Sequence, residues 1–209
     1  MLDKITINTH SSIRIAADRI LCFDPFKLET AAHDADIIFI THAHFDHFSP
    51  EDIEKAAKPD TVFVLPASME ADVRKAGIKE EFIHALVPGQ TTEICGIAVE
   101  AVPSYNIGKP MHPKKNGWLG YIVTVDDERI YVAGDTDATP EGAEAECSIA
   151  MIPIGGTYTM NAKEAAGLVN AMRPKAVIPT HYGSIVGAKK DAQKFTELVD
   201  DSIEVCLKL

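Results

Sequence analysis

Several features are scarce or missing in this sequence of 209 residues, and each argues against a class of protein. The chain has no CxxC redox pair and no local cysteine zinc site, because its four cysteines stand far apart at Cys22, Cys95, Cys147 and Cys206. We expect them to be reduced packing residues. No apolar run approaches the roughly 18 to 20 residues of a membrane span, and no export signal opens the chain. These absences predict a cytoplasmic protein without a membrane partner.

Positive charge is also scarce. Lysine and arginine number 20 against 31 aspartates and glutamates, for a formal net charge of -11. A long nucleic acid is therefore not expected as a partner, since phosphates need clustered cations. A small anionic substrate stays compatible, because bound metal ions can supply local positive charge. The length and the 46% hydrophobic content favour a single domain over residues 1–209, and a homo-oligomer is left open.

The apolar pattern predicts many short strands and fewer helices. Residues 4–9, 12–17 and 19–23 alternate as an antiparallel meander, and 36–40 reads as a buried strand. We expect helices over 49–57, 68–76, 161–172 and 188–199, and further strands over 61–65, within 82–102, and over 119–125, 129–133, 148–152, 176–179 and 203–207. Helices follow strands in both halves, which predicts a sandwich of two sheets with helices outside.

A dense group of metal-ligand side chains follows the strand predicted over 36–40. Three imidazoles and one carboxylate fall within six residues, at His42, His44, Asp46 and His47. On an extended segment His42 and His44 point the same way and can hold one ion, whereas Asp46 and His47 can reach a second. Surface histidines beside a turn aspartate are the alternative. The ligand types favour metal binding.

Two later residues repeat this placement. Asp135 follows the strand ending near residue 133, and His181 follows the strand over 176–179, so three strand ends are expected to converge. The Asp135 carboxylate can bridge two cations, and the His181 imidazole suits Zn, Mn or Fe. A turn aspartate and a loop histidine are the alternatives.

The motif His42-x-His44-x-Asp46-His47 resembles the HxHxDH signature of the metallo-β-lactamase superfamily. Asp24, Asp135 and His181 are similar to its early aspartate, its bridging aspartate and its terminal histidine ligand. The closest likeness is to the branch of small hydrolases that includes L-ascorbate-6-phosphate lactonase, on the segments GDTD (134–137), PIGG (153–156) and YTM (158–160). The resemblance implies an α+β fold, a four-layer αββα sandwich of two mixed β-sheets with helices on the outer faces.

The chain departs from the superfamily at the third ligand motif. Many members place a histidine after the strand that corresponds to residues 97–102, but this chain continues Pro103-Ser104-Tyr105-Asn106. We assign His112, the next histidine, as the third ligand of the first ion; otherwise that ion keeps fewer protein ligands. Asp24 is expected to accept an N–H from a ligand histidine, with a strand-end turn as the alternative. Three other histidines are expected to be structural or exposed, namely His10, His33 and His84.

These assignments predict a hydrolase with two divalent ions, zinc first and manganese or iron as alternatives. His42, His44 and His112 would hold one ion and Asp46, His47 and His181 the other. Asp135 would bridge them, and Asp46 and Asp135 would act in catalysis through a metal-activated water. The expected substrate is a small ester, lactone or related anion; a phosphodiesterase and a non-catalytic metabolite sensor are the alternatives. Lys109 would meet an anion, unless its loop is simply solvated, and the other expected substrate contacts are Tyr105, Asn106, Tyr158 and Tyr182.

Overall fold

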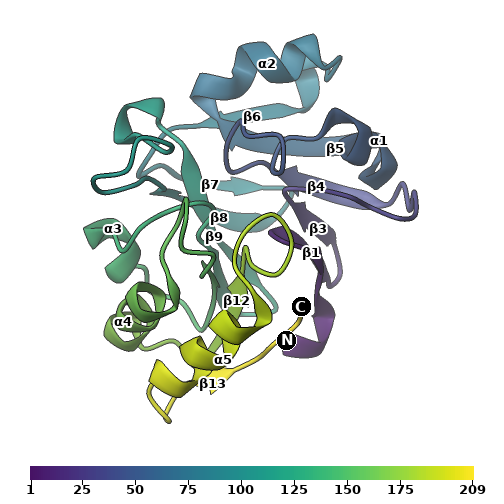
Figure 1. Ribbon diagram of the computed structural model, residues 1–209. Coiled ribbons are helices and arrows are strands. Elements are labelled where there is room, and N and C mark those ends of the chain that lie inside the picture. The colour runs from purple at the N-terminus through teal and green to yellow at the C-terminus, as the bar shows by residue number, and fades with distance from the viewer.

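The computed structural model describes residues 1–209 and contains two β-sheets packed face to face with helices on both outer surfaces (Figure 1). The first sheet has the order β1-β2-β3-β4-β5-β6. Its first three strands are antiparallel, and the pairs from β3 to β6 are parallel. The strands are β1 (Ile5–Thr9), β2 (Ser12–Ala16), β3 (Ile20–Phe23), β4 (Ala35–Phe39), β5 (Ala57–Pro66) and β6 (Ile83–Leu86).

The second sheet has seven strands in the order β13-β12-β11-β10-β9-β8-β7. Strands β7 to β10 pair in antiparallel fashion, and β10 to β13 are parallel. Both sheets are therefore mixed. The strands are β7 (Thr91–Ile94), β8 (Ile97–Pro103), β9 (Leu119–Val125), β10 (Glu128–Val132), β11 (Ile149–Pro153), β12 (Ala176–Thr180) and β13 (Glu204–Val205).

Three apolar cores hold these layers together. The largest lies between the sheets and includes the stacked rings of Phe23 and Phe39, with centroids 4.5 Å apart. A second lies under α4 (Ala162–Met172) and α5 (Lys189–Leu198), and a third under α1 (Pro50–Ala56) and α2 (Glu70–Lys75). The short α3 (Pro140–Ala143) packs beside α4. The predicted four-layer sandwich is confirmed.

Local signals explain where the helices begin. The Ser49 hydroxyl accepts from the Asp52 N–H ahead of Pro50, and the Asn161 side chain accepts from the Lys163 and Glu164 N–H groups in a capping box. Four short 3-10 turns complete the helical content, at Leu2–Lys4, Ala67–Met69, Glu80–Phe82 and Lys114–Asn116. None of the helices combines the length and the apolar character needed to cross a bilayer.

Some predicted boundaries were wrong. Strand β5 starts at Ala57 instead of residue 61, because a bulge lets Ala57 pair with Ala35 and the Thr61 hydroxyl donates to the Ala35 carbonyl. The helix predicted over 68–76 is divided into a 3-10 turn and α2, and β13 covers only two residues. Helix α3 was not predicted; Thr139 caps it and Pro140 begins it.

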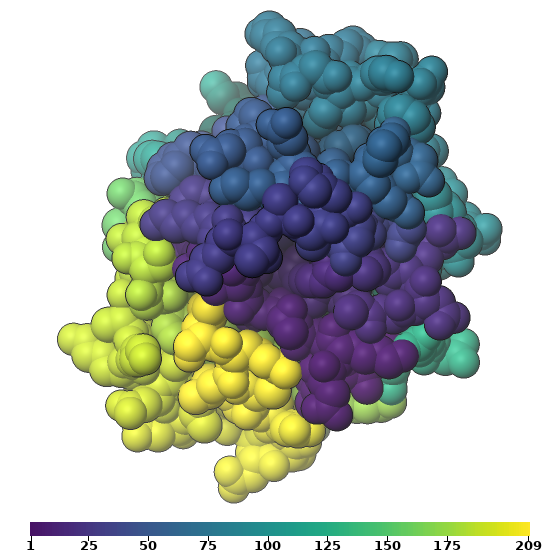
Figure 2. Space-filling view, turned by 90° about the vertical axis from the view of Figure 1, so that its right-hand side faces the viewer, coloured from purple at the N-terminus to yellow at the C-terminus, as the bar shows by residue number.

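The two ends of the chain lie side by side. The amino-terminal and carboxyl-terminal segments share one face of the molecule, drawn in purple and yellow (Figure 2). The Lys208 ammonium donates to the Leu2 carbonyl at 3.0 Å, which joins the edge of the second sheet to the start of the first.

Candidate metal centre

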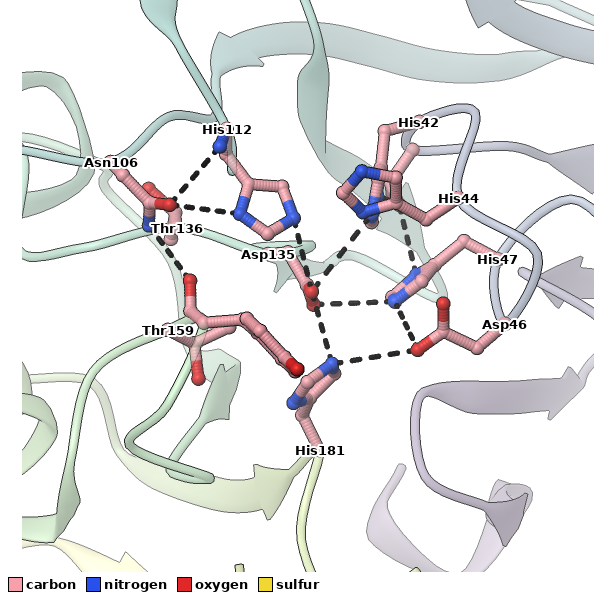
Figure 3. A network of polar contacts seen from close by, with 12 residues as sticks. His42, His44, Asp46, His47, Asn106, His112, Asp135, Thr136, Thr159 and His181 are labelled. Carbon is pink, nitrogen blue, oxygen red and sulfur yellow. Dashed lines mark hydrogen bonds and ion pairs between the residues drawn. The ribbon is translucent and has the colours of Figure 1, made fainter. Parts of the chain in front are cut away.

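Eight side chains with metal-binding atoms converge where several strands end, and Figure 3 shows seven of them at close range. They form two groups, and within each group the candidate ligand atoms lie within 4.8 Å of one another. Seven of the eight residues are buried; only His44 is partly exposed. The groups are His42, His44, His112 and Asp135 (the first group) and His10, Asp46, His47 and His181 (the second group).

The fold brings these residues together from both sheets. The 42–47 segment leaves β4 of the first sheet, whereas Asp135 follows β10 and His181 follows β12 of the second. His112 returns from the loop between β8 and β9. Gly134 makes the turn before Asp135 possible: its φ is 65°, and a Cβ there would lie only 3.0 Å from the Thr41 side chain.

Asp135, a member of the first group, lies between the histidines of the two groups. One carboxylate oxygen, Oδ2, lies 3.3 Å from His112 Nε2 and 3.0 Å from His181 Nε2. The other, Oδ1, lies 3.3 Å from His47 Nε2. Figure 3 shows this carboxylate at the centre of the dashed contacts. A carboxylate in this position can contact a cation held by either group.

Asp24 contacts His47, a histidine of the second group, at the ring nitrogen Nδ1. Its carboxylate accepts from His47 Nδ1 at 2.6 Å, from the Thr41 hydroxyl at 2.6 Å and from the Thr41 N–H at 2.8 Å. A proton on His47 Nδ1 leaves Nε2 free to face Asp46 and Asp135. The structure therefore places Asp24 beside His47, and its part as the partner of a ligand histidine stays a prediction.

His112 is oriented in the same way by Asn106. The Asn106 side-chain oxygen accepts from His112 Nδ1 at 2.9 Å and from the His112 N–H at 3.1 Å. The amide nitrogen of Asn106 donates to the Tyr158 carbonyl. Asn106 was predicted to contact substrate, but these bonds already occupy both ends of its side chain. In the structure its oxygen holds the His112 ring, and its contact with substrate stays a prediction.

The single tryptophan of the chain packs on the first group. The Trp118 ring centroid lies 4.9 Å from that of His42, 5.0 Å from that of His44 and 5.5 Å from that of His112. Its indole thus supports all three imidazoles of this group.

The buried carboxylates of the centre are stabilised by positive charge. Burial raises the pKa of Asp135, but His181 and His47 outweigh this and hold it well below its usual value. Burial lowers the pKa of His47, and Asp135 and Asp24 more than reverse the effect, so the net shift is well above the usual value. Buried carboxylates at this density need cationic partners.

The hydrogen bonding points to metal ions in particular. Several buried ligand atoms have no hydrogen-bond partner, among them Nε2 of His47, His112 and His181, and Oδ1 of Asp135. Leaving such groups unpaired costs roughly 1–3 kcal/mol each. Nitrogen and carboxylate oxygen are the donors that zinc, manganese and iron accept. The residues present fit a pair of divalent ions.

One member of the second group was missed at the sequence level. His10 was expected to be structural or exposed, but it is fully buried, and its Nε2 lies 3.2 Å from Asp46 Oδ2. It occupies the turn between β1 and β2, and its spacing from the other histidines gives no signal. His33 and His84 are exposed, as predicted.

Four other side chains were predicted to contact substrate, namely Tyr105, Lys109, Tyr158 and Tyr182. The Tyr105 hydroxyl donates to Glu141, and the Lys109 ammonium donates to Asp137 at 2.5 Å and to the Thr159 carbonyl. Tyr182 is buried in the core under α4 and α5, whereas Tyr158 is 36% exposed. Contact of these side chains with substrate stays a prediction.

Comparison with known proteins agrees with this fold and centre. The family model described as "Beta-lactamase superfamily domain" matches residues 4–181. A UPF0173 metal-dependent hydrolase of Pyrococcus horikoshii is 31% identical over 98% of this chain and 95% of its own length. One from Koribacter versatilis is 31% identical over 94% of this chain and 93% of its own length.

A crystal structure from Parabacteroides distasonis, assigned to the metal-dependent hydrolases, is 32% identical. It superimposes with a TM-score of 0.82 over 98% of this chain and 92% of that one. The chain therefore belongs to the beta-lactamase superfamily and, within it, to the UPF0173 metal-dependent hydrolases. The metallo-β-lactamase fold expected from the HxHxDH motif is confirmed.

Proposed function

We propose that this protein hydrolyses a small carboxylic ester or lactone with two divalent metal ions, and that zinc is the metal to expect. The observation that carries the proposal is the position of Asp135 between the two groups, 3.3 Å from His112 Nε2 on one side and 3.0 Å from His181 Nε2 on the other. His42, His44 and His112 would hold one ion, Asp46, His47 and His181 the other, and Asp135 would touch both.

The bound ions would supply a hydroxide at neutral pH, by lowering the pKa of water to about 7, and would polarise the carbonyl oxygen of the substrate. The chain's own part is positioning. Asp135 and Asp46 present carboxylate oxygens that can accept a proton from an attacking water and orient it. Asp24 and Asn106 hold the rings of His47 and His112.

The geometry also indicates where substrate approaches. His44 is the only residue of the two groups that is partly exposed, and the neighbouring Phe45 side chain is 68% exposed. An ester or lactone would therefore reach the centre past His44 and Phe45.

Two lysines of the loop between β8 and β9 are paired with carboxylates. Lys109 is paired with Asp137, and Lys114 is paired with Glu141 at 2.7 Å. Likeness to the ascorbate-6-phosphate lactonase branch supports lactone chemistry, whereas a phosphodiester would use the same ions and remains the second candidate.

The test combines metal analysis with a substrate panel. In Asp135→Ala and His47→Ala proteins, we expect both the metal content and the hydrolysis of generic lactones, esters and phosphodiesters to fall to background. His84→Ala, which changes an exposed histidine, is the matched control and should behave as wild type. Full metal content with undiminished turnover in the Asp135→Ala protein would refute the proposal.

The panel also separates the candidates. Chelator-sensitive turnover of lactones above that of phosphodiesters supports the proposal, and the reverse order supports a phosphodiesterase. Metal and metabolite binding without any chelator-sensitive turnover would identify a sensor instead.

A further inference from the structure

His10 belongs to a hairpin turn, but its side chain lies in the interior of the protein. The β1–β2 turn carries it, and turn residues normally lie on the surface. Here the His10 side chain is fully buried, and Ser11 and Ser12 beside it are also buried. Its backbone is left-handed, with φ at 55°, which is uncommon outside glycine. The fold thus holds an imidazole in the interior at some conformational cost.

The backbone of His10 is tied to the last residue of the second group. The His10 carbonyl accepts from the His181 N–H at 2.9 Å, and the two ring centroids are 3.7 Å apart. His181 also has a left-handed backbone, with φ at 58°. This contact joins the first hairpin of one sheet to the end of β12 in the other, and it aims both rings at Asp46.

Packing alone does not account for this imidazole. Neither ring nitrogen of His10 has a hydrogen-bond partner, although the ring is completely buried. Its Nε2 comes within 3.2 Å of Asp46 Oδ2 without the geometry of a hydrogen bond. A buried histidine that serves only as filler satisfies at least one nitrogen, because an unpaired one is costly.

The distances match those of ligands around one ion. Three nitrogens surround Asp46 Oδ2: His10 Nε2 at 3.2 Å, His47 Nε2 at 3.7 Å and His181 Nε2 at 3.8 Å. Ligands about 2.0–2.1 Å from a tetrahedral ion are about 3.3 Å from one another. Four donor atoms therefore lie at roughly the spacing of one coordination shell.

We propose that His10, through Nε2, is a fourth protein ligand of the ion held by Asp46, His47 and His181. The assignment rests on the metal pair of the proposed function. With Asp135 at its edge, this second-group ion has more protein ligands than the ion held by His42, His44 and His112. The second-group ion is then the more tightly held of the two, and the first-group ion is the one that exchanges readily.

The experiment is a metal titration that does not depend on turnover. The His10→Asn variant removes the imidazole but keeps a residue that tolerates a left-handed backbone. His33→Asn is the matched control, because His33 is also left-handed, with φ at 49°, but is exposed. Circular dichroism and thermal unfolding in chelator establish that each metal-free protein is folded.

Cadmium-113 NMR gives a separate resonance for each bound ion. The fluorescence of Trp118 responds to binding at the first group. In the wild type, the first equivalent of cadmium should fill the second group with little change at Trp118, and the second equivalent should change the fluorescence. In His10→Asn, one of two cadmium resonances should shift, and affinity for that ion should fall at least about tenfold. The order of filling should then be lost, while His33→Asn keeps it.

Each other outcome overturns the assignment in a recognisable way. Unchanged affinities and resonances in His10→Asn would remove His10 from the ligand set and leave the metal pair standing. Weaker binding with an unmoved resonance would make His10 a support for Asp46 and not a ligand. A wild type that binds fewer than two ions would overturn the proposed function itself.

Discussion

At the scale of single residues, the candidate centre includes groups that would support the proposed ligands without touching an ion. His47 and His112 each use Nδ1 for a hydrogen bond to an oxygen, from Asp24 and Asn106 respectively. Each bond fixes which ring nitrogen carries the proton and turns the other toward Asp135. The proposed ligands His47 and His112 thus take their ring directions from these two oxygens.

Asn106→Ala is therefore expected to weaken metal binding. His112 would lose the acceptor that fixes its tautomer and ring angle, and affinity for the first-group ion should fall about 10- to 100-fold. Competition with a chromophoric chelator measures this directly. Asn106→Asp keeps an acceptor oxygen at the same place and should recover most of the affinity. Equal affinity for the alanine variant and the wild type would show that His112 needs no such support.

At the scale of elements, strand ends were read well from the sequence and loop paths were not. The sequence predicts that three strands end just before His42, Asp135 and His181 and that these ends converge. The structure brings the three residues together. The approach of the β1–β2 hairpin is different. It depends on how the first sheet packs on the second, and no local pattern around His10 encodes that contact.

Strands and turns also set the reactivity of the cysteines. Burial raises the pKa of the Cys22 thiol in β3 to about 11 and that of Cys147, before β11, to about 12. Because a raised folded-state pKa favours the neutral thiol, both should stay protonated and unreactive at pH 8. Cys95 lies exposed in the β7–β8 turn.

Iodoacetamide at pH 8 is therefore expected to modify Cys95 before Cys22 and Cys147, as followed by peptide mass spectrometry. In denaturant all four cysteines should react, which provides the control for reagent access. Rapid labelling of Cys22 in the folded protein would mean that β3 opens far more readily than its buried position in the sheet implies.

At the scale of the whole molecule, metal ions would connect the two sheets. His10 and the 42–47 cluster come from the first sheet, whereas Asp135 and His181 follow strands of the second. A ligand that binds only the folded chain stabilises it, by about 4 kcal/mol at a free concentration 1,000 times its dissociation constant. Metal removal should therefore loosen the packing between the sheets.

Chelation should lower the unfolding temperature of the wild type by roughly 8–16 °C, since about 1 kcal/mol corresponds to roughly 2–4 °C for a chain of this size. Differential scanning calorimetry with and without chelator measures the shift, and added zinc should restore it. Asp135→Ala should show little shift. Coincident melting of the metal-loaded and chelated wild type would contradict the link between the sheets.

The fold as a whole was within reach of sequence reasoning. Alternating runs, caps such as Ser49 and the capping box at Asn161 are local signals, and they predict most elements to within a few residues. The His42-to-His47 cluster carries metal chemistry in its composition alone. The contacts of Trp118 with His42 and of His10 with His181 were missed because they join segments far apart in the chain. The bond between Asn106 and His112 spans only six residues, but it depends on the path of the loop.

The order of the ligands along the chain has a consequence for its synthesis. His10 is synthesised 171 residues before His181. Because chains emerge at about 5–20 residues per second, the early histidines spend many seconds without their last partner. A nascent chain would therefore complete the second group, and hold an ion there firmly, only after the strand that precedes His181 has been made.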